Sequence, residues 1–348
     1  MSADESLRQV LSGLAGGEAP SADATTAAFE AMMGGDASPL LIGAVLAAFR
    51  AAGETTDQVA GAARAMRACS EKVASARSPL VDTCGTGGDG RSTFSISTAA
   101  AFVAAGAGVA IAKHGNRAAS GKFGGADTLE ALGVAIDLPP AAAGRCLDEV
   151  GMAFLFARRM HPAMRFVGPV RAELGVRTIF NLLGPLTNPA GALRQVIGVP
   201  SPEVRDLMAG ALAVLGAEHA LVVCSEDGMD EISLAGTNEV VEVREGALRS
   251  FTLDAADLGL TAADSDAFFA AELEDSVRIV RSVLAGEPGP CRDIVLANAG
   301  AAIHVGGGAD TLSAGVQSAR ESIESGAAGR VLEQLVAVSQ REAQEAGA

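Results

Sequence analysis

Residues 85–127 carry an unusual concentration of groups that bind phosphate. Two stretches, 85–90 (GTGGDG) and 120–127 (SGKFGGAD), are rich in glycine, and 95–98 (SIST) and 113–117 (KHGNR) lie between them. Glycines let several backbone N–H groups face one point, and hydroxyls and cations add further donors to an anion held there. The segment therefore predicts a cradle for phosphates.

A flexible turn after a strand would also explain the glycines of 85–90 taken alone. The lysines favour the cradle, because the chain has only three, Lys72, Lys113 and Lys122, and two of them fall in this segment. A nucleotide-binding kinase loop would need the pattern GxxxxGK[ST], whereas the glycine loop here ends in Asp89-Gly90-Arg91.

Asp230 and Glu231 offer two hard oxygen ligands on a short loop after an apolar run. Such a pair suits Mg²⁺ bridged to a pyrophosphate better than zinc. Adjacent carboxylates in an acidic protein are more often solvated surface groups, so the metal site depends on the neighbouring phosphate cradle.

Ser95 to Thr98 precede a helical pattern, 99–105, and their hydroxyls would sit at a helix N-terminus facing the same cleft. A plain N-cap would also explain any one of them.

Two kinds of element must position these groups. Up to about Arg77, apolar residues recur at helical spacing in 7–14, 27–33, 40–49 and 59–73, with start signals at Ser38-Pro39 and Thr55-Thr56-Asp57. From Leu80 onward, short apolar runs alternate with helical patterns, at 80–84, 109–112, 152–156, 195–199 and 220–224. This order predicts a small all-α N-terminal domain, residues 1–77 joined by part of 163–190. A larger α/β domain, residues 78–348, would hold a mostly parallel central sheet and C-terminal helices.

The predicted strands end in the polar segments. Run 80–84 leads into the glycine loop, 109–112 into 113–116, 152–156 into 158–161, and 220–224 into 225–231. Open α/β sheets bind ligands at the carboxyl ends of their strands. Distant stretches of chain are therefore expected to converge on one cleft.

Composition excludes several classes of protein. A net charge of −16 and a pI near 4.7 disfavour binding to nucleic acid or to an anionic membrane, which requires a basic face. Five cysteines without CxxC spacing argue against a complete disulfide framework. The N-terminus lacks an apolar core, and the weakly polar run 98–112 is too short to span a bilayer. We therefore expect a cytoplasmic protein.

Seven motifs occur in order along the chain: GTGGDG, FSIST, KHGNR, GGAD-x-LEALG, HPAMR, PVRAELG-x-RTIFNLLGPLTNP and GMDEIS. In this combination the sequence closely resembles the anthranilate phosphoribosyltransferase family, and the likeness extends from the helical N-terminus to Asn298-Ala-Gly. The resemblance implies the nucleoside-phosphorylase type III architecture, usually as a homodimer. It also implies Mg²⁺-dependent transfer of the phosphoribosyl group of 5-phosphoribosyl-1-pyrophosphate (PRPP) to the amine of anthranilate, in tryptophan biosynthesis.

Two alternatives share parts of this pattern. A pyrimidine nucleoside phosphorylase has the same fold, but is expected to lack the HPAMR and NLLGPLTNP block. A non-enzymatic relative that binds nucleic acid would need a basic groove, which three lysines and a net charge of −16 contradict.

The resemblance also implies roles for individual residues. PRPP contacts would be Gly85, Gly88, Asp89, Thr93, Ser95, Ile96, Ser97, Thr98, Lys113, His114, Gly115, Asn116, Arg117, Ala118, Ala119, Ser120, Gly121 and Gly125. Anthranilate contacts would be Gly85, Asn116, His161, Arg171, Arg177 and Pro185, and the magnesium positions Ser97, Asp230 and Glu231. The family usually has Asn where this chain has Ser95, and commonly Ser where it has Gly125. At each position this chain therefore has a shorter side chain or one hydrogen-bond donor fewer.

Physical chemistry supports three catalytic assignments. Departure of pyrophosphate builds positive charge on the ribose C1 and negative charge on the leaving oxygens, so Mg²⁺, Lys113 and backbone N–H groups would stabilise it. The anthranilate amine is unprotonated at neutral pH and needs little general-base help, which leaves His161 a minor role. Arg171 supplies a planar fork for the substrate carboxylate.

Overall fold

The N-terminal part of the chain is a helical bundle. The computed structural model describes residues 2–87, 90–118 and 122–347, and the bundle consists of α1 (Ala3–Ala15), α2 (Ala22–Gly34), α3 (Pro39–Ala52) and α4 (Thr56–Ala68). Thr55 caps α4 in a reciprocal pair with Gln58, which confirms the predicted start. The pattern 59–73 predicted a longer helix, but α4 ends at Ala68. Beyond it, the N–H groups of Glu71 and Val73 donate to the carbonyls of Met160 and Pro189 instead.

A seven-stranded sheet forms the centre of the larger part. Its strands are β1 (Leu80–Gly85), β2 (Ala110–Gly115), β3 (Met152–Phe156), β4 (Arg194–Gly198), β5 (His219–Ser225), β6 (Asn238–Arg244) and β7 (Ala247–Leu253). The spatial order is β3-β2-β1-β4-β5-β6-β7, parallel from β3 to β5 and antiparallel beyond. The five predicted runs are all strands, and the mostly parallel sheet is confirmed.

The hairpin of β6 and β7 has no counterpart among the predicted strands. Its two-residue turn is Glu245-Gly246, and both residues have positive φ, 51° and 81°. A turn of this kind is usually marked by Asn-Gly or Asp-Gly, so Glu-Gly is a weak signal.

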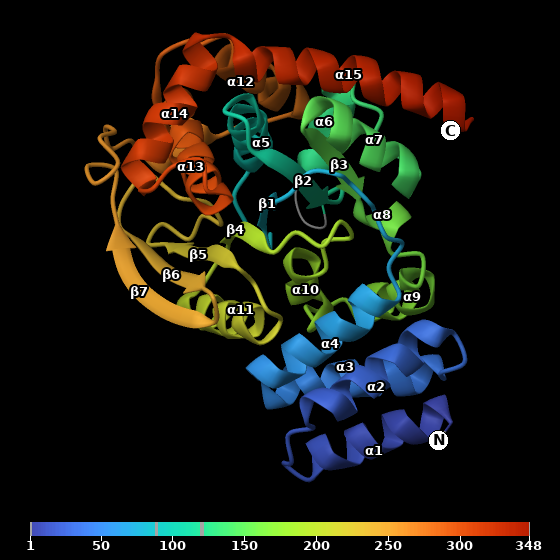
Figure 1. Cartoon of the computed structure of the whole chain (residues 1–348). Coiled ribbons are helices and arrows are strands. Elements are labelled where there is room, and N and C mark those ends of the chain that lie inside the picture. Colours follow the sequence, from blue (N-terminus) through green and yellow to red (C-terminus); the bar gives the residue numbers. More distant parts are fainter. Residues whose placement is uncertain (1, 88–89, 119–121, 348) are drawn as a thin grey trace.

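Helices cover both faces of the sheet (Figure 1). The helices of this part of the chain are α5 (Ile96–Gly106), α6 (Gly125–Leu132), α7 (Pro140–Val150), α8 (Ala157–Met160), α9 (Met164–Leu174), α10 (Phe180–Leu183), α11 (Pro202–Val214), α12 (Leu273–Leu284), α13 (Pro290–Gly306), α14 (Leu312–Glu324) and α15 (Ala327–Ala346), with 3₁₀ turns η1 (Gly184–Leu186) and η2 (Ser265–Phe268). Helices α5 and α13 pack on one face, and α11 packs on the other.

Two hydrophobic clusters hold these layers together. One joins α5, α13 and the helices behind them to one sheet face. The other runs from α1–α4 through α9, α10 and α11 to the opposite face of β4–β6. In it, the ring of Phe29 lies 6.0 Å from that of Phe49 and 5.1 Å from that of Phe180, so part of 163–190 packs with the bundle. The division into 1–77 and 78–348 stays a prediction.

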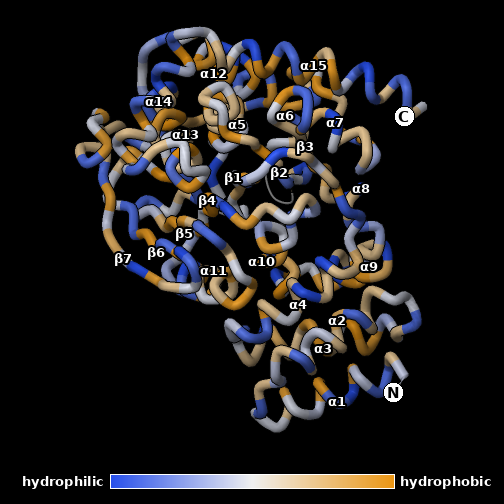
Figure 2. The backbone as a smooth tube through the Cα atoms, in the orientation of Figure 1, coloured by the Kyte–Doolittle hydropathy of each residue, from blue (hydrophilic) through white to orange (hydrophobic). Residues whose placement is uncertain are grey.

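Hydropathy along the chain follows this packing. Figure 2 shows hydrophobic and hydrophilic residues alternating along the outer helices, and the free end of α15 is hydrophilic. Across the described residues, no helix combines the length and apolar character that crossing a membrane requires. All five cysteines are free thiols.

Candidate active site

The strand order reverses between β1 and β4. The chain leaves β1 through α5 to reach β2 on one side, and leaves β4 through α11 to reach β5 on the other. Gly85 and Gly198 end these two neighbouring strands and are paired in register. In open α/β sheets such a switch point opens a crevice outside the carboxyl ends of the strands, where ligands bind.

The loop after β5 places Asp230 directly over this switch point. A Cβ on Gly85 would lie 2.1 Å from Asp230 Oδ2, and one on Gly198 would lie 1.6 Å from the Asp230 carbonyl oxygen. The Gly87 N–H donates to Asp230 Oδ2 at 2.8 Å. Only glycine leaves space for the loop at both strand ends, so the two glycines admit the carboxylate into the crevice.

The far side of the same loop is held by buried polar groups. The Ser225 hydroxyl donates to the Glu231 carbonyl at 2.5 Å. The Asn298 side chain accepts from the Ile232 N–H at 2.9 Å and donates to the Ile232 carbonyl at 3.0 Å. Asn298 thus acts as a clamp on the loop, and sequence reasoning gave it no role.

Ser97 brings the third predicted magnesium position to the two carboxylates. It lies in the first turn of α5, where its N–H donates to Glu231 Oε1 at 3.1 Å. A cavity of about 10 Å³ is lined by residues that include Ser97, Gly198 and Glu231. That volume is close to the minimum for one water molecule. The structure therefore brings Ser97 and Glu231 into contact, and the Asp230 carboxylate lies on the same loop beside Gly85 and Gly87.

Lys113 lies beneath these groups. The sequence predicted a strand that ended before it, but β2 continues through Lys113 to Gly115, because the pairing with β3 extends that far. The lysine is 4% exposed, and its Nζ donates to the Thr83 carbonyl at 2.5 Å and to Ser97 Oγ at 3.1 Å. Burial lowers the pKa of Lys113, while the charges of Asp82, Glu231 and Asp230 oppose that shift. The Thr83 carbonyl and the Ser97 hydroxyl thus fix the position of the Lys113 amino group.

Asp82 is a buried acid that sequence reasoning missed. Its Oδ1 accepts from the His114 N–H at 3.1 Å and its Oδ2 from Asn188 Nδ2 at 2.8 Å. Burial raises the pKa of Asp82 to about 6, although these hydrogen bonds and Lys113 favour the charged form. An acid within the apolar run 80–84 was the signal that could have revealed it.

His114 and His161 form a buried pair beside the segment 184–187. His114 Nδ1 lies 3.0 Å from the Gly184 carbonyl, which can only accept, so this nitrogen carries the proton. His114 Nε2 is then the acceptor for His161 Nε2, 3.1 Å away. Burial lowers the pKa of His114 to about 4, and burial with the nearby His114 lowers that of His161 to about 3. Both rings are therefore neutral at pH 7.

The two predicted anthranilate arginines differ in their surroundings. Arg171 on α9 is half-buried, and its guanidinium lies 5.3 Å from the centre of the Phe180 ring. Burial lowers the pKa of Arg171. Among the described residues, none forms an ion pair or hydrogen bond with its guanidinium.

Arg177 is exposed and lines a groove of about 800 Å³ with Thr55 and Glu203, separate from the cavity beside Ser97. Pro185 is buried, and its carbonyl accepts from Gln195 Nε2 at 2.6 Å.

The predicted PRPP hydroxyls divide into engaged and unengaged groups. Ser95 Oγ lies 2.7 Å from Thr128 Oγ1, and the Ser95 N–H donates to Ser276 Oγ at 3.1 Å, so its side chain ties α5 to α6 and does not cap the helix. Thr98 Oγ1 is buried without a hydrogen-bond partner in the described part of the chain. A Cβ on Gly125 would lie 3.1 Å from that oxygen. The Ile96 side chain is in the core, which leaves only its backbone for a ligand.

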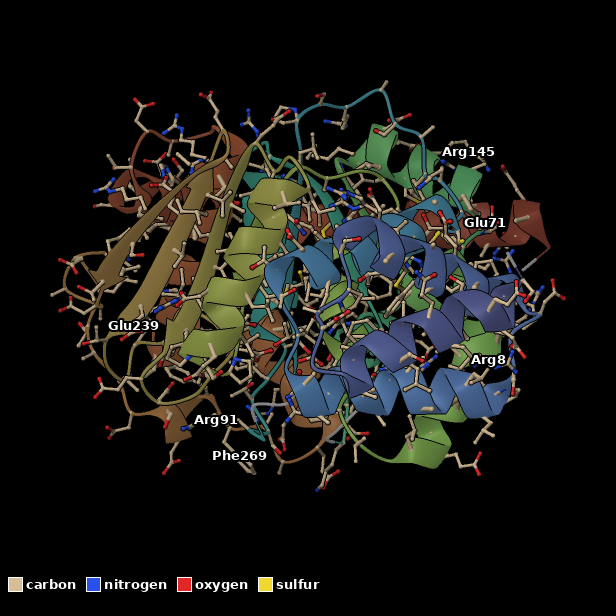
Figure 3. All side chains as sticks on the ribbon, turned by 90° about the horizontal axis from the view of Figure 1, so that it is seen from below. Arg8, Glu71, Arg91, Arg145, Glu239 and Phe269 are labelled. Atoms are coloured by element: carbon tan, nitrogen blue, oxygen red, sulfur yellow. The ribbon has the colours of Figure 1, made fainter. Side chains whose placement is uncertain are left out.

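Other predicted contacts are exposed or partly exposed. Arg117 forms ion pairs with Asp127 at 2.6 Å and Glu130 at 2.9 Å on α6, and Asn116 beside it is exposed. Thr93 forms an antiparallel bridge with Phe269, and Figure 3 shows Arg91 and Phe269 at the same edge of the molecule. Lys122 pairs with Glu272. Five predicted contacts, Gly88, Asp89, Ala119, Ser120 and Gly121, lie outside the described residues.

Comparisons with protein families match most of the chain. Residues 77–329 match the model described as glycosyl transferase family, a/b domain. Residues 6–70 match the glycosyl transferase family, helical bundle domain.

Several curated relatives of this chain are anthranilate phosphoribosyltransferases. The anthranilate phosphoribosyltransferase of Rubrobacter xylanophilus is 51% identical over 338 residues, which cover 96% of this chain and 98% of the relative. That of Roseiflexus castenholzii is 52% identical over 314 residues, covering 90% of this chain and 92% of the relative.

Solved structures agree with these relatives. The crystal structure of anthranilate phosphoribosyltransferase from Thermus thermophilus has a TM-score of 0.90 and 46% identity, covering 95% of this chain and 99% of that one. The Saccharomyces cerevisiae enzyme in complex with PRPP and Mg has a TM-score of 0.88 and 27% identity, covering 97% and 99%. The yeast complex with 4-fluoroanthranilate has a TM-score of 0.88 and 26% identity, covering 97% and 98%.

Proposed function

We infer that the site performs the reaction of the family to which this chain belongs, the anthranilate phosphoribosyltransferases. In that reaction the phosphoribosyl group of PRPP moves to the amine of anthranilate, giving N-(5-phosphoribosyl)anthranilate and pyrophosphate. The enzyme is thus a glycosyltransferase of tryptophan biosynthesis. The observation that carries the assignment is the Asp230-Glu231 loop seated on the glycine-marked switch point, with Ser97 and Lys113 against it.

Ser97, Asp230 and Glu231 are the residues that would hold Mg²⁺. The yeast relative binds PRPP together with Mg. Ser97 and Glu231 are in contact, and Gly85 leaves the space that admits the Asp230 carboxylate to the end of β1, so the donor set is all oxygen, as a hard divalent cation requires. When bound, the ion would stabilise the negative charge that develops on the departing pyrophosphate.

Lys113 would act through position and charge. Its Nζ donates to Ser97 Oγ, which leaves the Ser97 hydroxyl proton and a second lone pair for a phosphate oxygen or a cation. Its positive charge, fixed close to the crevice, favours the negative charge that gathers on the leaving pyrophosphate. The remaining predicted PRPP contacts, from Gly85 through Thr98 and from His114 through Gly125, stay proposals on the family pattern.

Arg171 would bind the carboxylate of anthranilate. A half-buried guanidinium without an anionic partner among the described residues has lost hydration and gained no ion pair, so an incoming carboxylate would be favoured there. Gly85, Asn116, His161, Arg177 and Pro185 are proposed as further contacts. Because the His161 ring is neutral at pH 7, it would serve as a hydrogen-bond partner and not as a general acid.

The proposed chemistry needs no nucleophilic side chain. The anthranilate amine attacks ribose C1, the C1–O bond to pyrophosphate breaks, and the amine then loses a proton. The protein holds both substrates and stabilises the charge that develops. A homodimer and a cytoplasmic location stay predictions.

A turnover assay tests this function. The protein is mixed with PRPP, Mg²⁺ and anthranilate, and the loss of anthranilate fluorescence is followed together with pyrophosphate release. The absence of Trp and Tyr keeps the optical background low. We expect both signals in equal amounts, and neither when any component is omitted. Pyrophosphate release without anthranilate would indicate hydrolysis and contradict the proposal.

A further inference from the structure

The four histidines of the chain form two pairs at opposite ends of the parallel strands. His114 and His161 lie near the candidate active site, whereas His219 begins β5 and packs against His304 at the end of α13. Ser225, at the other end of β5, holds the Asp230-Glu231 loop. At about 3.3 Å per residue, the six steps of this strand separate the two regions by roughly 20 Å. The second pair therefore belongs to a different part of the molecule.

A carboxylate completes the second pair. His219 Nε2 lies 2.8 Å from Glu242 Oε1 on the adjacent strand β6, and the rings of His219 and His304 have centroids 5.0 Å apart at an angle of 80°. One ligand atom from each of the three residues lies within 4.8 Å of the others. Within the described ranges, no other set of three His, Cys, Asp or Glu side chains is gathered in this way.

The contacts of His304 orient its ring for a ligand. His304 Nδ1 is 3.0 Å from the Ala309 carbonyl, so that nitrogen carries the proton and Nε2 keeps its lone pair. A backbone carbonyl on the second ring nitrogen is the usual support of a metal-binding histidine. His304 also lies in the last turn of α13, where the helix dipole favours a cation.

The site is shielded but not closed to solvent. The side chains of His219 and Glu242 are 9% and 12% exposed. The nearby cations are Arg249, 3.8 Å from Glu242 Oε2, and Arg244, which faces His219 across the strands, while Arg194 is held by Glu218. Arg249 is 76% exposed, so it can move into solvent when another cation takes its place.

We propose that His219, Glu242 and His304 bind one borderline divalent transition ion, of which Zn²⁺ is the representative. Two imidazoles and a carboxylate select such an ion over Mg²⁺, and a water would fill the fourth position. Bonds of about 2.1 Å in a tetrahedron place ligand atoms about 3.4 Å apart, which small side-chain rotations reach from the observed spacings. The ion would take the place of the hydrogen bond between His219 and Glu242, with the single ring proton of His219 moving from Nε2 to Nδ1, and would join β5, β6 and α13.

Because the three ligands come together only in the folded chain, binding would stabilise the fold. At a free Zn²⁺ concentration of about 100 times Kd, the melting temperature of a chain of this size would rise by about 3 to 4 °C. This effect needs neither substrate nor turnover.

The test is calorimetric titration of untagged, chelator-treated protein with ZnCl₂, supported by the visible spectrum after Co²⁺ addition. We expect one site per chain and tetrahedral Co²⁺ bands. His304→Gln should weaken binding at least tenfold and abolish the shift in melting temperature. Glu242→Gln is a second variant that keeps a polar partner for His219, and circular dichroism shows whether each variant is folded.

Two controls separate this site from others. His161→Gln alters the other histidine pair, and Asp230→Asn with Glu231→Gln alters the magnesium position; both should leave the zinc isotherm unchanged. Equal zinc affinity in wild type and in folded His304→Gln and Glu242→Gln would overturn the proposal. So would a wild-type chain that shows no saturable binding of Zn²⁺ and Co²⁺, or loss of binding only when the magnesium carboxylates are replaced.

Discussion

Gly85 leaves the space that the Asp230 carboxylate occupies, since a Cβ there would lie 2.1 Å from Asp230 Oδ2. Replacement of Gly85 by Ala must therefore displace the carboxylate or the strand end. We expect kcat/KM for PRPP to fall about 100-fold, the scale of a misplacement of about 1 Å at a reacting centre. The same variant should need a higher Mg²⁺ concentration to reach half of its maximal rate.

The matched control for this variant is Gly34→Ala in α2. A Cβ at Gly34 meets no atom within 4 Å, so activity should be unchanged. A Gly85→Ala enzyme with wild-type kinetics and metal dependence would show that Asp230 need not sit where the structure places it.

Arg171→Ala should damage anthranilate use selectively. Loss of a charge-assisted pair is expected to raise the KM for anthranilate by the equivalent of about 2 to 3 kcal/mol, with PRPP affinity preserved. Arg171→Lys should recover little of the lost affinity for anthranilate, because an ammonium group cannot form the two parallel hydrogen bonds of a planar guanidinium. Arg165→Ala is the control, since Arg165 is on the same helix and lies 4.6 Å from the Phe166 ring. Equal losses for both substrates would count against the assignment.

Asp230→Asn combined with Glu231→Gln should remove the magnesium dependence of turnover. Amides keep the size of the side chains but lose the charges that a hard cation requires. Residual activity is expected to be low and insensitive to added Mg²⁺, as measured by initial rates over a metal titration. Glu226→Gln, an exposed change in the same loop, should retain the normal response. An unaltered metal response in the double variant would refute the magnesium site.

The His114–His161 pair should make the fold less stable in acid. The folded pKa values of about 4 and about 3 lie below the ordinary 6.5, so the unfolded chain binds more protons in that interval. Their contribution to the free energy of unfolding is present above pH 6.5 and is lost as pH falls through about 4 and about 3.

Asp82 acts in the opposite sense, because its folded pKa of about 6 is above the ordinary 3.8. Its contribution to the free energy of unfolding is lost as pH rises through about 6.

His161→Gln tests this linkage. The amide can still donate to His114 Nε2, but it cannot be protonated in the unfolded chain. Urea unfolding followed by circular dichroism should show that the variant loses less stability than wild type between about pH 6.5 and about pH 4. At about pH 8 the imidazoles are neutral in both the folded and the unfolded chain. The difference in free energy of unfolding between variant and wild type at that pH therefore measures the effect of the substitution apart from proton binding. Parallel pH profiles for the two proteins would contradict the assignment of neutral rings.

The arrangement at the carboxyl ends of the strands was largely predictable because it depends on local signals. Glycines end β1, hydroxyls begin α5, and a carboxylate pair follows β5, and each is a pattern of a few residues. The topological rule for parallel sheets then brings these ends together without knowledge of any contact.

Groups whose role depends on distant partners were not predictable. Asn298 clamps Ile232 from another helix, and Asp82 holds the His114 N–H and the Asn188 amide. Lys113 was expected to follow its strand, whereas pairing with β3 carries the strand past it and turns its ammonium onto Thr83 and Ser97. The β6–β7 hairpin was missed because Glu245-Gly246 is an uncommon sequence for its turn.

We propose that loops distant in sequence form one site that holds a metal-bound PRPP. A crystal structure with PRPP and Mn²⁺ in place of Mg²⁺ tests it most directly, because the anomalous signal of manganese locates the ion without reference to the protein. We predict the anomalous peak between Ser97, Asp230 and Glu231, with the pyrophosphate of PRPP against the glycine loop after Gly85. A manganese peak away from the Asp230-Glu231 loop, or PRPP bound at another face of the sheet, would contradict the proposed site.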